Sequence, residues 1–198
     1  DLNLNLFLHH RRLQNAGMLN YYRRRDVPHC HRGQPLSASI LAVGKNEDED
    51  RGVSDRRLGN WSDRDMPCPR LAYGAQLTRF SSRRGERWRV AVSDLPHYFH
   101  NLGTSTAHEP HNALGPVFLA VEVRAAGLYV PDDILDDEEV LGCLRCLMMG
   151  DKKAVSCAQE AHYAMLRDGG LDEEYLEYGV PITGEGLEYG VVVDDLAI

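Results

Sequence analysis

The predicted fold depends most on the stretch Val191-Val192-Val193-Asp194-Asp195-Leu196-Ala197-Ile198, in which two adjacent acids separate two apolar runs. β-Branched residues favour strands, and aspartate favours turns because its carboxylate bonds nearby backbone N–H groups. We therefore predict a strand over residues 187–193, a tight turn at Asp194-Asp195 and a returning strand from Leu196. The hairpin carries two carboxylates at its tip.

A third acid, Asp94, ends another strand predicted over residues 88–93. Acids beside buried apolar strands need cations or solvent as partners. Two Mg²⁺ ions roughly 3.5–4 Å apart, bridged by aspartates, can activate a 3′-hydroxyl and stabilise leaving pyrophosphate. Turns also favour aspartate for backbone reasons alone, so the Asp194-Asp195 pair gains meaning only from its companions.

The remaining pattern alternates strands with helices and shows no internal repeat. Residues 38–44 read as a strand, 45–50 as a hairpin tip and 51–57 as the returning strand. Further predictions are a short helix over 71–80, a strand over 116–123, a solvated acidic segment over 132–139 and a helix over 151–167 with Asp151 as its N-cap.

Charge divides the chain, although its net value is −8. Residues 1–93 hold 17 Lys and Arg against 10 Asp and Glu, a net of +7, and residues 94–198 hold 5 against 20, a net of −15. A basic half can hold phosphates and an acidic half can hold cations, although both can also be ordinary solvated surfaces.

The chain has the composition of a soluble globular protein, with 43% hydrophobic and 26% charged residues. No apolar run reaches the length of a membrane span, and the start lacks the order of a secretory signal. Five scattered cysteines fit reduced thiols, so we expect an intracellular protein, cytoplasmic or nuclear, that makes no contact with membranes. The initial Asp1 favours a fragment of a longer product.

Four stretches, in the order expected and over about four-fifths of the chain, resemble the reverse transcriptase family. In the fingers, the Lys45 hairpin followed by Arg51-x-x-x-Asp55-x-Arg57-x-x-Asn60 resembles the strand pair that grips triphosphate and template. In the palm, three stretches resemble the family's successive motifs: Asp94-Leu95-Pro96-His97-Tyr98-Phe99, Met149-Gly150-Asp151 and Val192-Val193-Asp194-Asp195.

The resemblance implies catalytic and metal-binding roles at four positions. Asp94 and Asp194 would bind both metal ions, and Asp195 would be a weaker ligand. Leu95 would contribute its carbonyl oxygen. The expected cofactor is a pair of Mg²⁺ ions, with Mn²⁺ as a possible substitute.

Four further positions acquire nucleotide-binding roles from the resemblance. Lys45 and Arg51 would hold the β- and γ-phosphates, which their charge and reach permit. Gly150, which has no Cβ, would let the backbone pass close to the nascent base pair. Phe99 would lie under the sugar and exclude a 2′-hydroxyl.

The resemblance implies an α/β (α+β) fold: a polymerase palm with an antiparallel sheet, a fingers β-hairpin and no thumb. The fingers-like subdomain would cover 38–90 and an incomplete palm-like subdomain 91–198, whereas the basic segment 1–37 stays unassigned. The implied activity is RNA-directed DNA polymerase, in a retrotransposon polyprotein with further domains. Its partners would be an RNA or DNA template with primer and deoxynucleoside triphosphates, and the fragment alone is expected to be inactive.

Three alternatives remain beside this interpretation. Val192 replaces the usual aromatic residue, and the fingers tip is acidic over 46–50, which suits a decayed or repurposed domain that binds nucleic acid or packs structurally without catalysis. Cys143-x-x-Cys146 with His29-Cys30-His31 could bind zinc, but 141–148 reads as a strand, where positions three apart face opposite sides. His97-x-x-His100 suits a metal hydrolase but has no supporting ligand.

Overall fold

In the computed structural model the chain has a mixed α/β fold with antiparallel sheets, as the sequence predicts. The structure describes residues 2–44, 50–65, 71, 85, 87, 89–171, 176 and 189–197. Two compact units emerge, the first built from residues 1–64 and 99–152 and the second from 65–98 and 153–198. Among the described residues, no helix combines the length and apolar character that crossing a bilayer requires.

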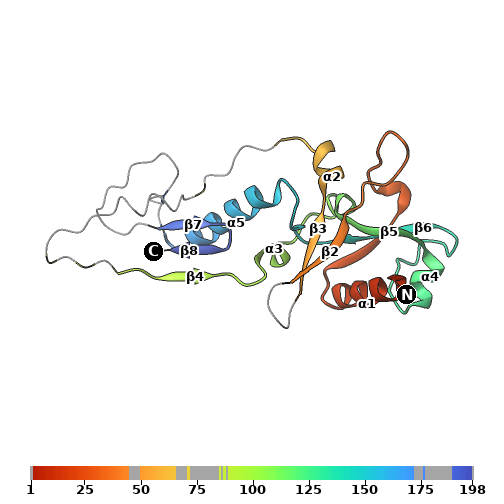
Figure 1. Ribbon diagram of the computed structural model, residues 1–198, viewed down its shortest axis with the longest axis horizontal. Coiled ribbons are helices and arrows are strands. Elements are labelled where there is room, and N and C mark those ends of the chain that lie inside the picture. Colours follow the sequence, from red (N-terminus) through yellow and green to blue (C-terminus); the bar gives the residue numbers. More distant parts are fainter. Residues whose placement is uncertain are drawn as a thin grey trace. The chain divides into compact units, whose positions relative to one another are not determined.

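The first unit is built on a three-stranded antiparallel sheet in the order β1-β6-β5 (Figure 1). Its strands are β1 (Leu19–Arg23), β5 (Ala113–Leu119) and the central β6 (Glu139–Leu144). Its helices are α1 (Leu2–Asn15), α2 (Arg57–Ser62), α4 (Ala120–Ala125) and the short 3-10 turns η1 (Arg24–Asp26) and η3 (Glu109–Asn112).

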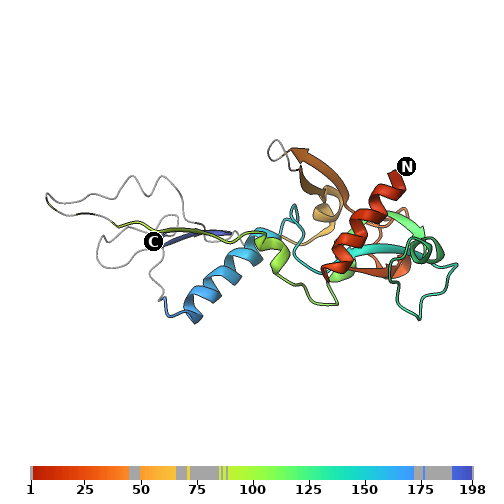
Figure 2. The same cartoon turned by 90° about the horizontal axis from the view of Figure 1, so that it is seen from below.

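Helix α1 covers one face of this sheet (Figure 2). The ring of Phe7 lies 4.6 Å from that of Phe118 on β5, and His10 bonds the Tyr21 hydroxyl of β1 at 2.7 Å. The sequence left residues 1–37 unassigned because their hydrophobic period is weak. The structure shows that α1 and β1 complete the core of this unit.

A two-stranded hairpin, β2 (Ser39–Gly44) with β3 (Asp50–Asp55), also belongs to the first unit. The register runs from Ser39 opposite Asp55 to Gly44 opposite Asp50, so the predicted hairpin is confirmed. Its base joins the sheet, because Ala38 donates its N–H to the carbonyl of Ala113 at 2.8 Å.

The strand predicted over 116–123 is wrong at both ends. β5 begins earlier, at Ala113, and helix α4 begins at Ala120. The helix starts there because the Glu122 carboxylate accepts the Leu119 backbone N–H at 2.9 Å, which satisfies an N–H at the helix start. Both segments are apolar, so the change from strand to helix left no clear mark in the hydrophobic pattern.

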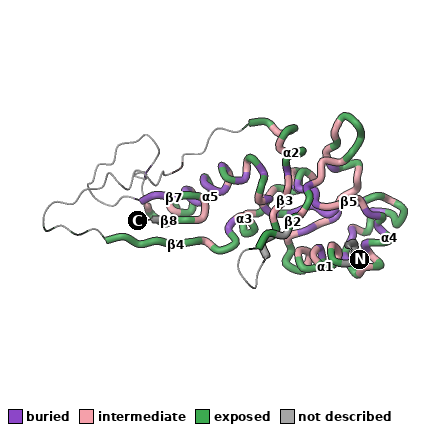
Figure 3. The backbone as a smooth tube through the Cα atoms, viewed as in Figure 1, coloured by how far each residue is buried: buried purple, intermediate pink, exposed green. Residues whose placement is uncertain are grey.

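The second unit combines a three-stranded antiparallel sheet, in the order β4-β8-β7, with one long helix. The strands are β4 (Val92–Asp94), β7 (Gly190–Val192) and the central β8 (Asp195–Ala197), and the helix is α5 (Ala154–Asp168). Its core gathers Tyr163 of α5 with Tyr189 and Val191 of the hairpin. β4 is exposed along its whole length (Figure 3).

Helix α5 was predicted correctly as a helix but with the wrong start. It begins at Ala154 after Lys153 rather than at an Asp151 cap. The Asp151 carboxylate instead forms a buried ion pair with Arg56 at 3.2 Å. The helix predicted over 71–80 lies outside the described residues except at Leu71.

Candidate active site

The strand that ends at Asp94 lies directly beside the hairpin that carries Asp194 and Asp195. Asp94 on β4 is the register partner of Asp195 on β8. Directly opposite residues of an antiparallel pair point to the same face with Cβ atoms about 4.5–5.5 Å apart. The carboxylates of Asp94 and Asp195 therefore share one sheet face.

Asp194 occupies the turn between β7 and β8, next to a residue in an uncommon conformation. Val193 has φ of 59°, which is an outlier for a β-branched side chain. The Leu95 N–H donates to the Asp194 carbonyl at 3.1 Å, so the strand after Asp94 is bonded to the turn. The two chain segments that carry the acids are held together by backbone.

The three acids have no compensating cation within the part of the chain that the structure describes. Among the described residues, no hydrogen bond or ion pair engages the side chains of Asp94, Asp194 or Asp195. Like charges directly opposite on a sheet are destabilising, so the Asp94–Asp195 pair favours a cation between its members. Carboxylate oxygens are hard donors of the kind that Mg²⁺ prefers.

The donor type therefore fits a divalent cation, but the three side chains are not gathered into a ready cage. Within the described ranges, no group of three or more His, Cys, Asp and Glu side chains converges as a metal site. Two acids share a face, and the third lies in the adjoining turn.

Helix α5 supplies contacts to this hairpin that the sequence did not predict. The Gln159 amide bonds both Val191 and Val193, and the His162 ring bonds Val193. Gln159 lies within the helix predicted over 151–167, and the sequence indicates no role for it. Its complete burial beside apolar neighbours is visible only in the fold.

Tyr98 and Phe99, both on α3 (Tyr98–Asn101), have different environments. Tyr98 is buried and donates its hydroxyl to the Ala158 carbonyl of α5 at 2.9 Å. The pKa of Tyr98 is raised, chiefly by burial and then by the negative charge of Asp194. Phe99 is only partly buried, so its ring is the more accessible of the two.

Gly150, in the first unit, meets the backbone of β3 rather than open space. Its φ is 98°, and an added Cβ would lie 2.6 Å from the Ser54 carbonyl oxygen. Asn60 spans the same junction, because its side chain donates to the Gly150 carbonyl at 2.8 Å and accepts the Lys152 N–H at 3.1 Å. The glycine is thus required for packing, independently of any nucleotide.

Buried charges hold this junction together. Arg56, whose side chain is 4% exposed, pairs with Asp151 at 3.2 Å and with Asp63 at 3.3 Å. It also donates to the Asn112 side-chain oxygen at 2.7 Å. The motif recognised in the sequence contains its neighbours Asp55 and Arg57 but not Arg56. Asp55 and Arg57 form a solvent-exposed pair with each other.

Of the two predicted phosphate-binding cations, the structure places only the backbone of Arg51. Arg51 lies on β3 opposite Val43, and its side chain is not described. Lys45 lies outside the described residues. Their roles remain predictions.

The sulfur and histidine alternatives gain no support from the described residues. Cys143 lies on β6, both Cys143 and Cys146 are buried, and burial raises the pKa of Cys146 to about 11. Buried neutral thiols are inert core side chains and poor metal ligands. His97, with φ of 56°, precedes α3, and no third ligand accompanies it within the described ranges.

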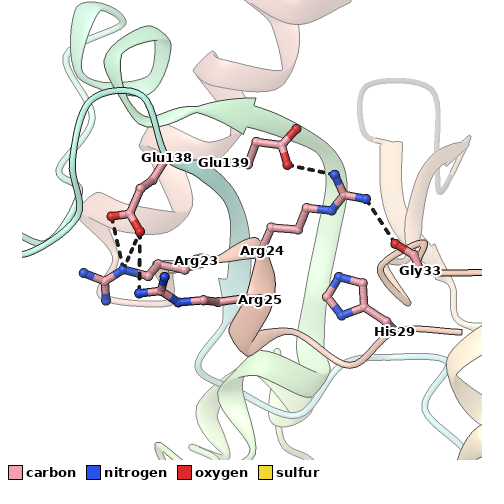
Figure 4. Close-up of a pocket in the computed structure, with 7 residues that line it drawn as sticks. All are labelled: Arg23, Arg24, Arg25, His29, Gly33, Glu138 and Glu139. Carbon is pink, nitrogen blue, oxygen red and sulfur yellow. Dashed lines mark hydrogen bonds and ion pairs between the residues drawn. The ribbon is translucent and has the colours of Figure 1, made fainter.

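A pocket of about 560 Å³ in the first unit is lined by three arginines and two glutamates (Figure 4). Its arginines are already engaged: Arg23 bonds Glu138 at 3.1 Å, and Arg24 bonds Glu139 at 2.7 Å. Arg25 lies 3.6 Å from Glu138. These ion pairs connect the acidic segment 132–139 to the end of β1 and to η1. This acidic segment is partly used in structure, rather than being wholly solvated as predicted.

Comparisons with known proteins show a likeness in structure but none in sequence. No protein-family model matches the sequence, and no curated protein is similar to it. Among solved structures, the foamy viral protease-reverse transcriptase in complex with double-stranded DNA matches with a TM-score of 0.55 at 14% identity, covering 93% of this chain and 28% of that one. The native prototype foamy virus protease-reverse transcriptase matches with a TM-score of 0.54 at 13% identity, covering 94% and 18% respectively.

This likeness concerns the fold alone. The chain spans less than a third of the length of these structures, which places the similarity in one part of a larger protein. The fold is therefore similar, at a distance, to part of a reverse transcriptase.

Proposed function

We propose that this chain is the fingers and palm of an RNA-directed DNA polymerase that performs template-directed nucleotidyl transfer by two-metal catalysis. The observation that carries the proposal is the cross-strand pairing of Asp94 with Asp195, with Asp194 in the adjoining turn. The fold likeness supports it, and so does the order of the four motifs along the chain.

The acidic residues would hold two divalent ions, Mg²⁺ or Mn²⁺, which would stabilise the attacking and leaving oxygens of an in-line displacement. Asp94 and Asp194 would contact both ions, with Asp195 and the Leu95 carbonyl as additional oxygen donors. The Leu95–Asp194 backbone bond supports this assignment because it holds both acid-bearing segments at one level of the sheet.

The remaining roles concern substrates. Lys45 and Arg51 would bind the triphosphate, Gly150 would approach the nascent base pair, and Phe99 would select deoxynucleoside triphosphates over ribonucleotides. A template with primer, of RNA or DNA, would be the macromolecular partner. The parent would be a retrotransposon polyprotein with further domains.

A second candidate is a reverse-transcriptase-like domain that binds nucleic acid or packs structurally without catalysis. The specific observation in its favour is that, among the described residues, no three acids converge on one point. Val192, which is 42% exposed where the family has an aromatic residue, points the same way.

Metal titration of the 198-residue chain separates the two candidates. The chain is titrated with Mn²⁺ and followed by electron paramagnetic resonance, alongside Asp94→Asn, Asp194→Asn and the control Asp132→Asn, an exposed acid of the first unit. Under the polymerase proposal, Asp94→Asn and Asp194→Asn should lose Mn²⁺ binding, and the control should bind Mn²⁺ as wild type does. Equal binding by all four proteins would favour the non-catalytic domain.

Activity requires a longer protein that contains this chain, because a polymerase needs contacts behind the primer to hold in-line geometry. In that protein, Asp94→Asn or Asp194→Asn should abolish primer extension and leave template binding largely intact, since the basic region supplies the phosphate contacts. Parallel loss of binding and extension would indicate misfolding.

A further inference from the structure

The Gln159 side chain bonds both a backbone carbonyl and a backbone N–H of the β7–β8 hairpin, as a neighbouring strand does in a sheet. Its amide nitrogen donates to the Val191 carbonyl at 2.9 Å, and its amide oxygen accepts the Val193 N–H at 2.7 Å. Among the strands that the structure describes, β7 is the edge strand of its sheet, so no described strand bonds these backbone groups. The side chain is completely buried, and both of its polar atoms are bonded.

His162 lies three residues after Gln159 on α5 and bonds the carbonyl group of the same residue, Val193. Its Nδ1 lies 2.8 Å from the Val193 carbonyl oxygen. A carbonyl can only accept, so Nδ1 carries the hydrogen and donates. Both backbone groups of Val193 are therefore held by two side chains of one helix face.

The bonded residue is also the one in an uncommon conformation. A non-glycine residue at positive φ costs on the order of 1–3 kcal/mol and persists only when its surroundings impose it. Within the described ranges only two non-glycine residues have positive φ, Val193 immediately before Asp194 and His97 three residues after Asp94. Both therefore flank the acid-bearing segments.

The same helix face also reaches the segment that follows Asp94. The Tyr98 hydroxyl donates to the Ala158 carbonyl at 2.9 Å, and its ring lies 5.6 Å from that of His162. Ala158, Gln159 and His162 thus lie on one side of α5. They contact the segment that follows Asp94 and the strand that precedes Asp194.

We infer that Gln159 and His162 are positioning residues that impose the left-handed conformation of Val193 and so fix where Asp194 presents its carboxylate to a metal ion. The inference rests on the proposed function. An amide and an imidazole suit the task, because both can bind backbone groups and, among the described residues, neither bonds the carboxylates of Asp94, Asp194 or Asp195. Contacts of this outer kind are commonly worth 10–100-fold in metal affinity.

The test uses the whole chain and two independent pairs of variants. Gln159→Met keeps the length of the side chain and removes both bonds, and Val155→Ala truncates an exposed residue of the same helix as its control. His162→Phe removes the bond to Val193, whereas His162→Asn places a donor near the position of Nδ1. Circular dichroism verifies the fold of each variant.

Two readouts are taken: Mn²⁺ affinity and hydrogen exchange of the Val193 amide. Gln159→Met should weaken Mn²⁺ binding about tenfold and accelerate exchange of that amide by a similar factor, with Val155→Ala unchanged. His162→Phe should weaken binding and His162→Asn should restore most of it. If Gln159→Met does not fold, the His162 pair decides alone.

Failure of this inference differs from failure of the proposed function. If wild type binds Mn²⁺, Asp194→Asn abolishes binding and the Gln159 and His162 variants bind like wild type, the positioning role is wrong and the metal site stands. If Asp194→Asn does not alter Mn²⁺ binding, the proposed site is wrong, and the inference falls with it. In a longer polymerase, Gln159→Met should lower kcat more than it raises KM for nucleotide; an effect on KM alone would overturn the inference.

Discussion

Two hairpins of this molecule are anchored by opposite chemistry. The β2–β3 hairpin of the first unit is secured through Arg56, a buried cation paired with the carboxylates of Asp63 and Asp151. The β7–β8 hairpin of the second unit is secured by hydrogen bonds from the side chains of Gln159 and His162 to its backbone. Arg56 neutralises acids within the first unit, whereas Gln159 and His162 bond backbone, and no described residue pairs with the carboxylates of Asp94, Asp194 or Asp195. Only the second arrangement keeps carboxylates available to bind a cation.

The difference predicts unequal sensitivity to mutation. Removing one member of a buried ion pair leaves a charge without compensation, at a cost of about 3–5 kcal/mol. A neutral hydrogen bond contributes about 0.5–1.5 kcal/mol. The first hairpin should therefore depend strongly on single side chains for stability, and the second should depend on its anchor mainly for geometry.

The largest expected effect is that of Arg56→Leu, which should lower the free energy of unfolding by about 3–5 kcal/mol because the buried Asp151 and the partly buried Asp63 lose this cation. Urea unfolding followed by circular dichroism measures it. Arg57→Leu is the control, because Arg57 is 89% exposed and the loss of its pair with Asp55 should change stability little. Equal effects of the two substitutions would refute the buried anchor.

A neutral buried group in the first unit should make stability depend on pH. Burial, and then the nearby charge of His9, lowers the pKa of His10 from 6.5 to about 4. Between pH 6.5 and about 4, His10 is protonated in the unfolded chain but not in the folded chain. The free energy of unfolding is therefore at its full value above pH 6.5 and decreases as the pH falls toward 4. The loss should reach about 3 kcal/mol.

Unfolding measured at several pH values tests this dependence with His10→Gln as comparison. The substitution removes the titrating group, so its stability should vary less between pH 6.5 and pH 4 than that of wild type. Identical pH profiles for the two proteins would show that His10 does not titrate in this way.

Gly150→Ala should cost roughly 2 kcal/mol, because the new Cβ would meet the Ser54 carbonyl at 2.6 Å in a left-handed conformation. Gly33→Ala is a matched control: its φ is 71°, but an added Cβ has nothing within 4 Å. The excess loss in Gly150→Ala over Gly33→Ala, from parallel urea curves, isolates the close contact at the base of the first hairpin. No excess would mean that β3 can move away.

The smallest expected effect concerns substrate choice in a longer polymerase that contains this chain. Phe99→Val should raise ribonucleotide use relative to deoxynucleotide use about tenfold, equivalent to about 1.4 kcal/mol of barrier. Tyr98→Phe should leave that ratio unchanged, because the Tyr98 hydroxyl is bonded to Ala158. Single-nucleotide incorporation measures both, and a changed ratio in Tyr98→Phe with none in Phe99→Val would move selection to Tyr98.

Sequence patterns predicted the elements better than their ends. The Asp194-Asp195 hairpin, the strand before Asp94 and the β2–β3 hairpin follow from apolar runs interrupted by turn residues, and all three form. The start of α5 was missed because Asp151 is a good cap by residue type, but it lies three residues before the helix and pairs with Arg56. A distant partner outweighed the local preference.

The sequence by itself determined which residues are acidic, where strands turn back and the order of the motifs, because each depends on residues a few positions apart. Only the tertiary structure decided which carboxylates are paired with a cation, as Asp151 is with Arg56. Asp151 and Arg56 are 95 positions apart in numbering, and Gln159 and Val193 are 34 apart. Such pairs carry no periodic signal, since the fold alone brings them within bonding distance and selects their partners from many residues of the same type.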